Sequence, residues 1–190
     1  MNIDVAKEKL RTYFDEACKV LNVNHETIDF AYEGIGERFK TNDVTCETAE
    51  NILYINLKWL EMLPDNDNGD YDLRHQMYHE ARHFYQHNAI ADYHTRGKTT
   101  ELPSTIKKWE FESSNYKPNE GTEEERKAYA VQDVEIDANA FAIAMLHANG
   151  IDKARIPAEL MVETSKRAQE IYSRLERLGR WKKHKKVNEQ

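Results

Sequence analysis

Residues 79–83 of the chain read HEARH, a His-Glu-x-x-His pattern from which the fold and the function are interpreted. On a helix, residues i and i+4 lie one above the other on the same face, so His79 and His83 can bind one metal ion from a rigid element. Glu80 would lie beside the metal, where its carboxylate can take a proton from a bound water. The motif therefore predicts a metal site on a helix; the alternative interpretation is a pair of solvated surface histidines.

The helix that carries this motif is predicted over residues 72–90, and Asp70 or Asp72 could cap its start. Its apolar residues form one stripe, which consists of Leu73, Met77, Ala81, Phe84 and Tyr85. At about 100° per residue, His79 and His83 lie roughly 150° from the centre of that stripe. We therefore expect the stripe to lie on the strands and the two histidines to face a cleft.

A third ligand is expected from residues 135–142, which read EIDANAFA. Glu135 shares its helix face with three alanines, and small side chains allow another helix to come close. Asp137 points about 200° away from Glu135. This difference favours Glu135 as the ligand, with a helix-surface carboxylate as the alternative. Asn139, one turn beyond Glu135 on the same face, is placed for a hydrogen bond to a ligand histidine.

HEARH followed by EIDANAFA resembles the gluzincin-type zinc peptidases, specifically the compact minigluzincins and the ImmA/IrrE-like metallopeptidases. The resemblance covers roughly residues 50–148. It implies a zincin-like fold and one zinc ion per chain, held by His79, His83 and Glu135. It also implies Glu80 as the general base that activates a zinc-bound water for hydrolysis of a peptide bond.

The strand ILYINL, residues 52–57, resembles the edge strand that lies along the cleft in these families, where an extended peptide substrate could add by strand pairing. The metzincin pattern is not matched, because Gln86 and Ala89 occupy its glycine and third-histidine positions. The chain also departs from the smallest family members through its extra length over residues 95–121. We expect this insertion to be mainly a long loop. It could cover the cleft as a lid, select the substrate that enters it, or block the site.

The remaining elements were predicted from local patterns. They are an opening helix over residues 3–21, a hairpin over residues 28–40, one or two helical turns over residues 58–63 before Pro64, a third long helix over residues 123–148 with a Thr122–Glu125 capping box, and a final helix from near Pro157. Helices and strands that cluster rather than alternate indicate an α+β fold. We expect a mainly helical, zincin-like domain with a small antiparallel or mixed sheet of about three strands packed on the motif helix. This single domain spans residues 1–190, with its core over about 1–178 and a basic tail over 179–190.

Composition excludes several classes of protein. The chain has 190 residues, of which 39% are hydrophobic, and its ten tyrosines, six phenylalanines and three tryptophans are typical of a folded domain. No apolar run approaches the roughly 20 residues of a membrane span, and the start lacks the apolar segment of a secretory signal. Cys18 and Cys46 provide no disulfide framework. We expect a cytoplasmic protein with no membrane association.

Other roles and partners are less well defined by the sequence. His87 and Tyr129 are possible contacts to the oxyanion or the substrate; His87 could equally be an exposed polar residue. The basic run from Arg180 to Lys186 could contact phosphate, but the net charge of −7 argues against nucleic-acid binding. A different class of function is a catalytically silent module that recognises a partner protein, with residues 95–121 closing the cleft. The substrate and the oligomeric state are left open.

Overall fold

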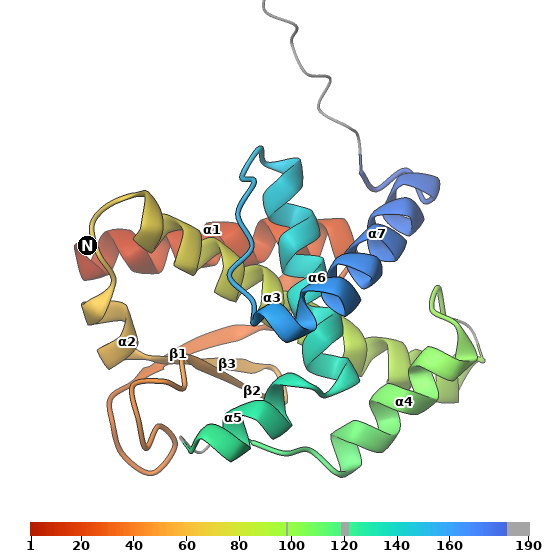
Figure 1. Cartoon of the computed structure of the whole chain (residues 1–190), viewed down its shortest axis with the longest axis horizontal. Coiled ribbons are helices and arrows are strands. Elements are labelled where there is room, and N and C mark those ends of the chain that lie inside the picture. Colours follow the sequence, from red (N-terminus) through yellow and green to blue (C-terminus); the bar gives the residue numbers. More distant parts are fainter. Residues whose placement is uncertain (98, 119–121, 182–190) are drawn as a thin grey trace, which may run out of the picture.

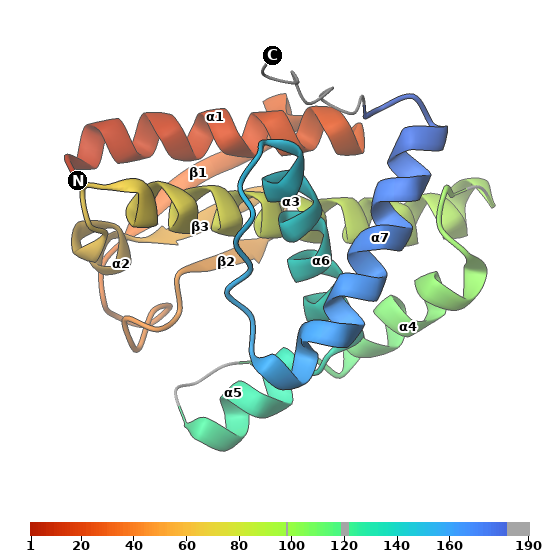
Figure 2. The same ribbon diagram turned by 45° about the horizontal axis from the view of Figure 1, so that its top comes forward.

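The long helix α3 (Asp67–Arg96) carries the HEARH motif and is the element around which the others pack (Figures 1 and 2). This computed structural model describes residues 1–97, 99–118 and 122–181. The other helices are α1 (Ile3–Leu21), α2 (Leu57–Met62), α4 (Pro103–Ser114), α5 (Glu123–Ala130), α6 (Asp133–Ala148) and α7 (Met161–Arg177). Short 3-10 helices η1 (His25–Thr27) and η2 (Ala158–Leu160) and the strands β1 (Asp29–Glu33), β2 (Cys46–Ala49) and β3 (Ile52–Asn56) accompany them. The predicted α+β class, mainly helical with a small mixed sheet, is confirmed.

The apolar stripe of α3 packs on helices more than on strands. Helix α3 contacts α1, α4 and α6 as well as β2, and in Figure 2 α1 runs alongside it. The Phe84 ring meets the Phe14 ring of α1 edge-on at 5.6 Å between centroids, and Tyr85 meets Trp109 of α4 at 6.4 Å. The expectation that the stripe lies on the strands was therefore wrong for these aromatic residues, because α1 and α4 occupy that side of the helix.

The sheet has the order β1-β3-β2, which differs from the predicted hairpin. Strand β1 pairs in parallel with β3, with Asp29 opposite Ile52, and β2 pairs with β3 in the antiparallel sense. Residues 34–45 form a connection that contains an isolated bridge between Ile35 and Phe39. The partner of β1 is thus a strand later in the chain, and local alternation of apolar residues cannot indicate such a pairing.

The same topology corrects the choice of edge strand. Strand β3, which contains most of the ILYINL run, is central, and Leu53 and Ile55 on it are fully buried. The edge strand next to α3 is β2. The buried Asn56 at the end of β3 holds the preceding connection in place, because its side-chain amide donates to the carbonyl oxygens of Thr41 and Val44.

Helix α3 starts earlier and ends later than predicted. Its N-cap is Asn66, whose side-chain oxygen accepts from the backbone N–H groups of the first turn, so neither Asp70 nor Asp72 is the cap. Asp70 instead accepts hydrogen bonds from the side chains of Lys9, Tyr13 and Arg74. The helix continues to a left-handed cap at Gly97, with φ 63°.

The insertion over residues 95–121 is not mainly a loop, because α4 occupies its centre. Pro103 lies in the first turn of α4, where its missing N–H and fixed φ are compatible with a helix. Ile106 and Trp109, three residues apart, are buried against the core. Only two buried apolar residues mark this helix, so its periodicity in the sequence is weak.

The predicted third helix is divided in two. The capping box between Thr122 and Glu125 is present at the start of α5, but the helix ends at Ala130 and α6 starts at Asp133. Between them, the buried Gln132 uses its side chain to bind the backbone of Lys117, donating to its carbonyl oxygen and accepting from its N–H. This tertiary contact interrupts a stretch that local propensity alone would continue.

The final helix, α7, packs across α6 and begins at Met161, after η2. Trp181 is buried beside Tyr172, with 5.6 Å between ring centroids. The Arg180 guanidinium donates to the carbonyl oxygen of Leu21. Most of the predicted basic tail, residues 182–190, lies outside the described residues. No helix among the described residues is long and apolar enough to cross a membrane.

Candidate metal centre

His79 and His83 from α3 and Glu135 from α6 meet at one point, and we call these three residues the candidate metal centre. Their ligand atoms all lie within 4.8 Å of one another. His79 Nε2 is 3.2 Å from Glu135 Oε2, His83 Nε2 is 3.5 Å from Glu135 Oε1, and the two Nε2 atoms are 2.9 Å apart. The Glu135 side chain is completely buried and His79 is buried too, so these histidines are not solvated surface residues.

The donor set and its spacing fit a zinc ion. Two imidazole nitrogens and one carboxylate leave an open position in catalytic zinc sites. Donors about 2.0–2.2 Å from a tetrahedral zinc lie about 3.3 Å apart, close to the three observed separations. The buried oxygen Oε2 of Glu135 also has no hydrogen-bond partner. A buried carboxylate oxygen that accepts no hydrogen bond is stabilised by a nearby cation.

The charges at the candidate metal centre are strongly coupled. Burial alone would lower the pKa of His83, but the negative charge of Glu135 and a hydrogen bond to it raise this pKa to about 9. Burial would raise the pKa of Glu135, and the neighbouring His83 and His79 instead lower it below its usual range. In the metal-free protein, a proton on His83 therefore balances the buried carboxylate.

Asn139 orients His79, as the sequence predicted. Its amide nitrogen donates to the backbone carbonyl oxygen of Glu135 at 2.9 Å, so its oxygen Oδ1 faces His79 Nδ1 at 3.2 Å. An amide oxygen only accepts, so His79 carries its proton on Nδ1 and turns the lone pair of Nε2 toward Glu135.

A second amide, which sequence reasoning missed, contacts the other histidine. Gln86 Oε1 lies 2.9 Å from His83 Nδ1, and the Gln86 side chain is buried. In the sequence, Gln86 served only to exclude the metzincin pattern. Its position three residues after His83, on the same side of a helix, is the signal that could have indicated this contact.

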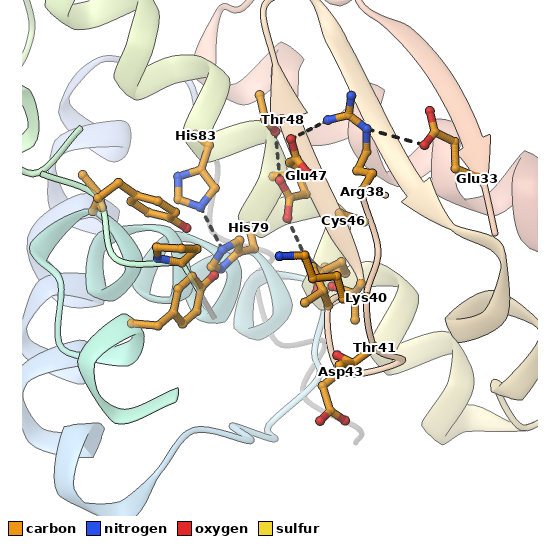
Figure 3. Close-up of a pocket in the computed structure, with 18 of the residues that line it drawn as sticks. Glu33, Arg38, Lys40, Thr41, Asp43, Cys46, Glu47, Thr48, His79 and His83 are labelled. Carbon is orange, nitrogen blue, oxygen red and sulfur yellow. Dashed lines mark hydrogen bonds and ion pairs between the residues drawn. The ribbon is translucent and has the colours of Figure 1, made fainter. Parts of the chain in front are cut away.

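Glu80 lines the cleft, and both of its carboxylate oxygens accept hydrogen bonds. Thr48 Oγ1 of β2 donates to one oxygen at 3.0 Å, and Gln76 Nε2, one turn earlier on α3, donates to the other at 2.7 Å. Figure 3 shows Thr48 on β2, and His79 and His83 on α3, among the residues that line the same cavity. Neither Thr48 nor Gln76 was predicted; the four-residue spacing of Gln76 from Glu80 was the available signal.

The candidate metal centre opens into a cavity of about 1140 Å³ between α3, β2 and the connection over residues 34–45. Figure 3 shows charged side chains of the connection and of β2 along one wall, with Arg38 paired to both Glu33 and Glu47. The opposite wall is one face of α3, whose histidines recur every four residues at His75, His79, His83 and His87. The predicted orientation of the motif histidines toward a cleft is confirmed. His87 lines the cavity and is exposed, as the alternative interpretation expected; its contact with the oxyanion or the substrate stays a prediction.

Two tyrosines that line the cavity, Tyr116 and Tyr129, lie near Glu135. The Tyr116 hydroxyl donates to Glu135 Oε1 at 2.8 Å, and the Tyr116 and Tyr129 rings pack edge-on at 6.1 Å. Burial and the negative charge of Glu135 raise the pKa of both phenols, so both remain hydrogen-bond donors. Tyr116 was missed because it lies in the insertion. Tyr129 lies on α5, before the break that precedes Asp133, so its position relative to Glu135 does not follow from one continuous helix.

Arg82 and Asp137, which lie next to metal-centre residues in the sequence, belong to a separate buried group. Arg82 is 2% exposed, and its guanidinium donates to Asp137 Oδ2 at 2.7 Å and to Glu101 Oε1 at 3.0 Å. Arg167 and Arg174 of α7 bind the same two carboxylates. We call these five residues the ionic cluster. Asp137 is thus directed away from the metal centre, and the cation inside the motif is paired with carboxylates.

In comparisons with known proteins, no family model, no curated protein and no solved structure matched this chain. The functional interpretation therefore depends on the residues and on their geometry.

Proposed function

We propose that this chain is a zinc-dependent metallopeptidase. The observation that carries the proposal is the convergence of His79, His83 and Glu135 beside a large cavity that Glu80 also lines. This combination provides three metal ligands and a separate carboxylate that is available as a base. A zincin-like fold and a cytoplasmic location, which suits the free thiols of Cys18 and Cys46, are parts of the same proposal.

A zinc ion held by the two histidines and Glu135 would polarise a peptide carbonyl and lower the pKa of a bound water to about 7. Glu80 takes the proton of the attacking water and passes it to the leaving nitrogen. The hydrogen bonds from Thr48 and Gln76 restrict the rotation of the Glu80 carboxylate. They therefore reduce the reorganisation that the proton transfer requires.

Tyr116 and Tyr129 are the candidate donors to the developing oxyanion. Their phenols stay protonated, both residues line the cavity, and the Tyr116 hydroxyl donates to Glu135. A donor held in position stabilises negative charge that appears only in the transition state. Gln132 supports this arrangement, because it binds the backbone of Lys117, next to Tyr116.

The substrate that this cleft favours is an extended peptide. Strand β2 is an edge strand of the sheet, and both Cys46 and Thr48 on it line the cavity. An extended chain can add to such an edge through backbone hydrogen bonds, with alternate side chains directed into the cavity. The sequence predicted that a peptide substrate pairs with the strand ILYINL, residues 52–57. Because β3 is central, we propose that the substrate pairs with β2 instead.

The test combines metal content with hydrolysis. We expect about one zinc per wild-type chain and none in His83→Ala, measured on protein purified without an affinity tag. Glu80→Gln has nearly the same shape and should keep the metal while losing at least about 100-fold in the hydrolysis of a peptide library. Full activity of Glu80→Gln would remove Glu80 from the mechanism. Zinc binding without cleavage of any peptide by the wild type would favour the silent binding module.

A further inference from the structure

The amide of Gln86 has only one orientation that satisfies its surroundings. Its nitrogen Nε2 donates to the backbone carbonyl oxygen of Val134 at 2.9 Å and to Asp137 Oδ2 at 2.8 Å. Both of these partners accept hydrogen bonds and cannot donate. The two amide hydrogens are therefore used on α6, and the oxygen Oε1 has to face His83. Gln86 is 2% exposed, so water does not compete for these contacts.

This orientation determines the state of the His83 ring. Because Gln86 Oε1 only accepts, the hydrogen bond of 2.9 Å requires a proton on His83 Nδ1. The neutral ring then has its lone pair on Nε2, the atom that faces Glu135 and His79. A metal ion binds that form of the imidazole, and the hydrogen bond also restrains rotation of the ring.

The ionic cluster holds Asp137 against Gln86. Arg82 Nε donates to Asp137 Oδ2 at 2.7 Å, and Arg167 Nε donates to Asp137 Oδ1 at 2.7 Å. These two guanidiniums come from α3 and α7, so the carboxylate is fixed from two sides. It cannot turn away from Gln86 without breaking a buried ion pair.

We propose that Gln86 is a positioning residue for His83, and that Asp137 of the ionic cluster fixes Gln86 in turn. The inference rests on the proposed function in that His83 is taken to bind a metal. It adds a route by which Asp137 of α6, and Arg167 of α7 that holds it, influence the metal affinity through Gln86. Asn139 orients the ring of His79 through a hydrogen bond at Nδ1, as Gln86 orients the ring of His83. Of these two amides, Gln86 is the one that also binds the ionic cluster.

The first test measures zinc affinity by competition with a chelator, together with thermal unfolding of the metal-free protein. Gln86→Met keeps the length of the side chain and removes the amide. We expect it to weaken zinc binding about 10- to 100-fold, as for other residues that orient metal ligands. The matched control is Arg174→Met, which breaks the ionic cluster at Glu101 without touching Gln86. It should lower the unfolding temperature and leave the zinc affinity within about twofold. Unchanged zinc affinity of Gln86→Met would overturn the proposal.

The second test observes the His83 Nδ1–H proton by NMR in the metal-free wild type. A proton bonded to a buried amide oxygen should exchange slowly with water, and Gln86→Met should remove that protection. This measurement on the wild type requires neither zinc nor a stable variant. Rapid exchange in the wild type would refute the positioning role. If the chain binds no zinc but the proton is protected, the metallopeptidase proposal fails and the Gln86 contact stands.

Discussion

The candidate metal centre and the ionic cluster are both buried, and the same two helices supply residues to both. Helix α3 provides His83 to the metal centre and Arg82 to the cluster, and α6 provides Glu135 and Asp137 respectively. Each pair is separated by only one or two positions in the sequence. Sequence neighbours on a helix point in different directions, so they enter two different environments.

The two groups differ in how their charges are balanced. Within the ionic cluster, each oxygen of Asp137 and Glu101 accepts from an arginine, and Asp137 Oδ2 also accepts from Gln86. In the metal centre, Glu135 Oε2 has no hydrogen-bond partner and two histidine nitrogens face each other at 2.9 Å. The carboxylate oxygens of the ionic cluster are therefore all hydrogen-bonded within the protein. The metal centre requires a proton or a cation from solution.

The largest expected effect distinguishes the two acidic residues of α6. Glu135→Ala should abolish zinc binding, because two histidines on one helix remain as the only ligands. Asp137→Ala should retain one zinc per chain at saturating zinc, although with weaker affinity and lower stability. Metal content of the two purified variants, measured after incubation with excess zinc, provides the comparison. Loss of zinc from Asp137→Ala alone would reverse the assignment of the two sites.

A smaller effect is expected from the substitution of Arg82, one of the three arginines of the ionic cluster. Arg82→Met should lower the free energy of unfolding by about 3–5 kcal/mol, because it removes the most buried of the three cations that pair with Asp137 and Glu101. Urea unfolding of the metal-free protein measures this change. The exposed Lys108, paired with Asp133 at the surface, offers a control: Lys108→Met should cost about 0–1 kcal/mol. Equal effects of the two substitutions would show that Arg82 does not have the structural role that its contacts indicate.

The smallest of the three effects is a pH dependence that belongs to the metal centre alone. The pKa of His83 is about 9 in the folded protein, against an ordinary value of 6.5. The resulting stabilisation is fully present below pH 6.5 and is lost as the pH rises through 9. We expect the metal-free protein to lose about 3 kcal/mol of unfolding free energy over this range. His83→Gln, measured in the same way, should lack this loss, and a pH dependence identical to that of the wild type would contradict the coupling between His83 and Glu135.

Much of the helical structure could be predicted because its signals are local. The opening helix has the predicted bounds, and the capping box at Thr122 and the helix end at Asn149 and Gly150 are present. Helix α4 was missed because its buried side is short and its first turn contains Pro103. The parallel pairing of β1 with β3 was missed because it joins strands about 20 residues apart, which no local pattern describes.

The site shows the same division between local and distant signals. The sequence indicated His79, Glu80, His83 and Glu135, and the structure brings these side chains together. It did not indicate Thr48 or Tyr116, which reach the site from β2 and from the segment after α4. A single threonine or tyrosine outside a motif carries no spacing that could distinguish it from an ordinary packing or surface residue.

By itself, then, the sequence determined which residues share a helix face, because a spacing of three or four residues follows from helix geometry alone. It thereby selected Glu135 over Asp137 and paired Asn139 with a motif histidine. The tertiary structure alone decided which strand borders the cleft, and what surrounds Arg82 and Gln86. Those contacts depend on how α3, α6, α7 and the sheet pack together, and packing joins residues whose separation in the chain has no fixed period.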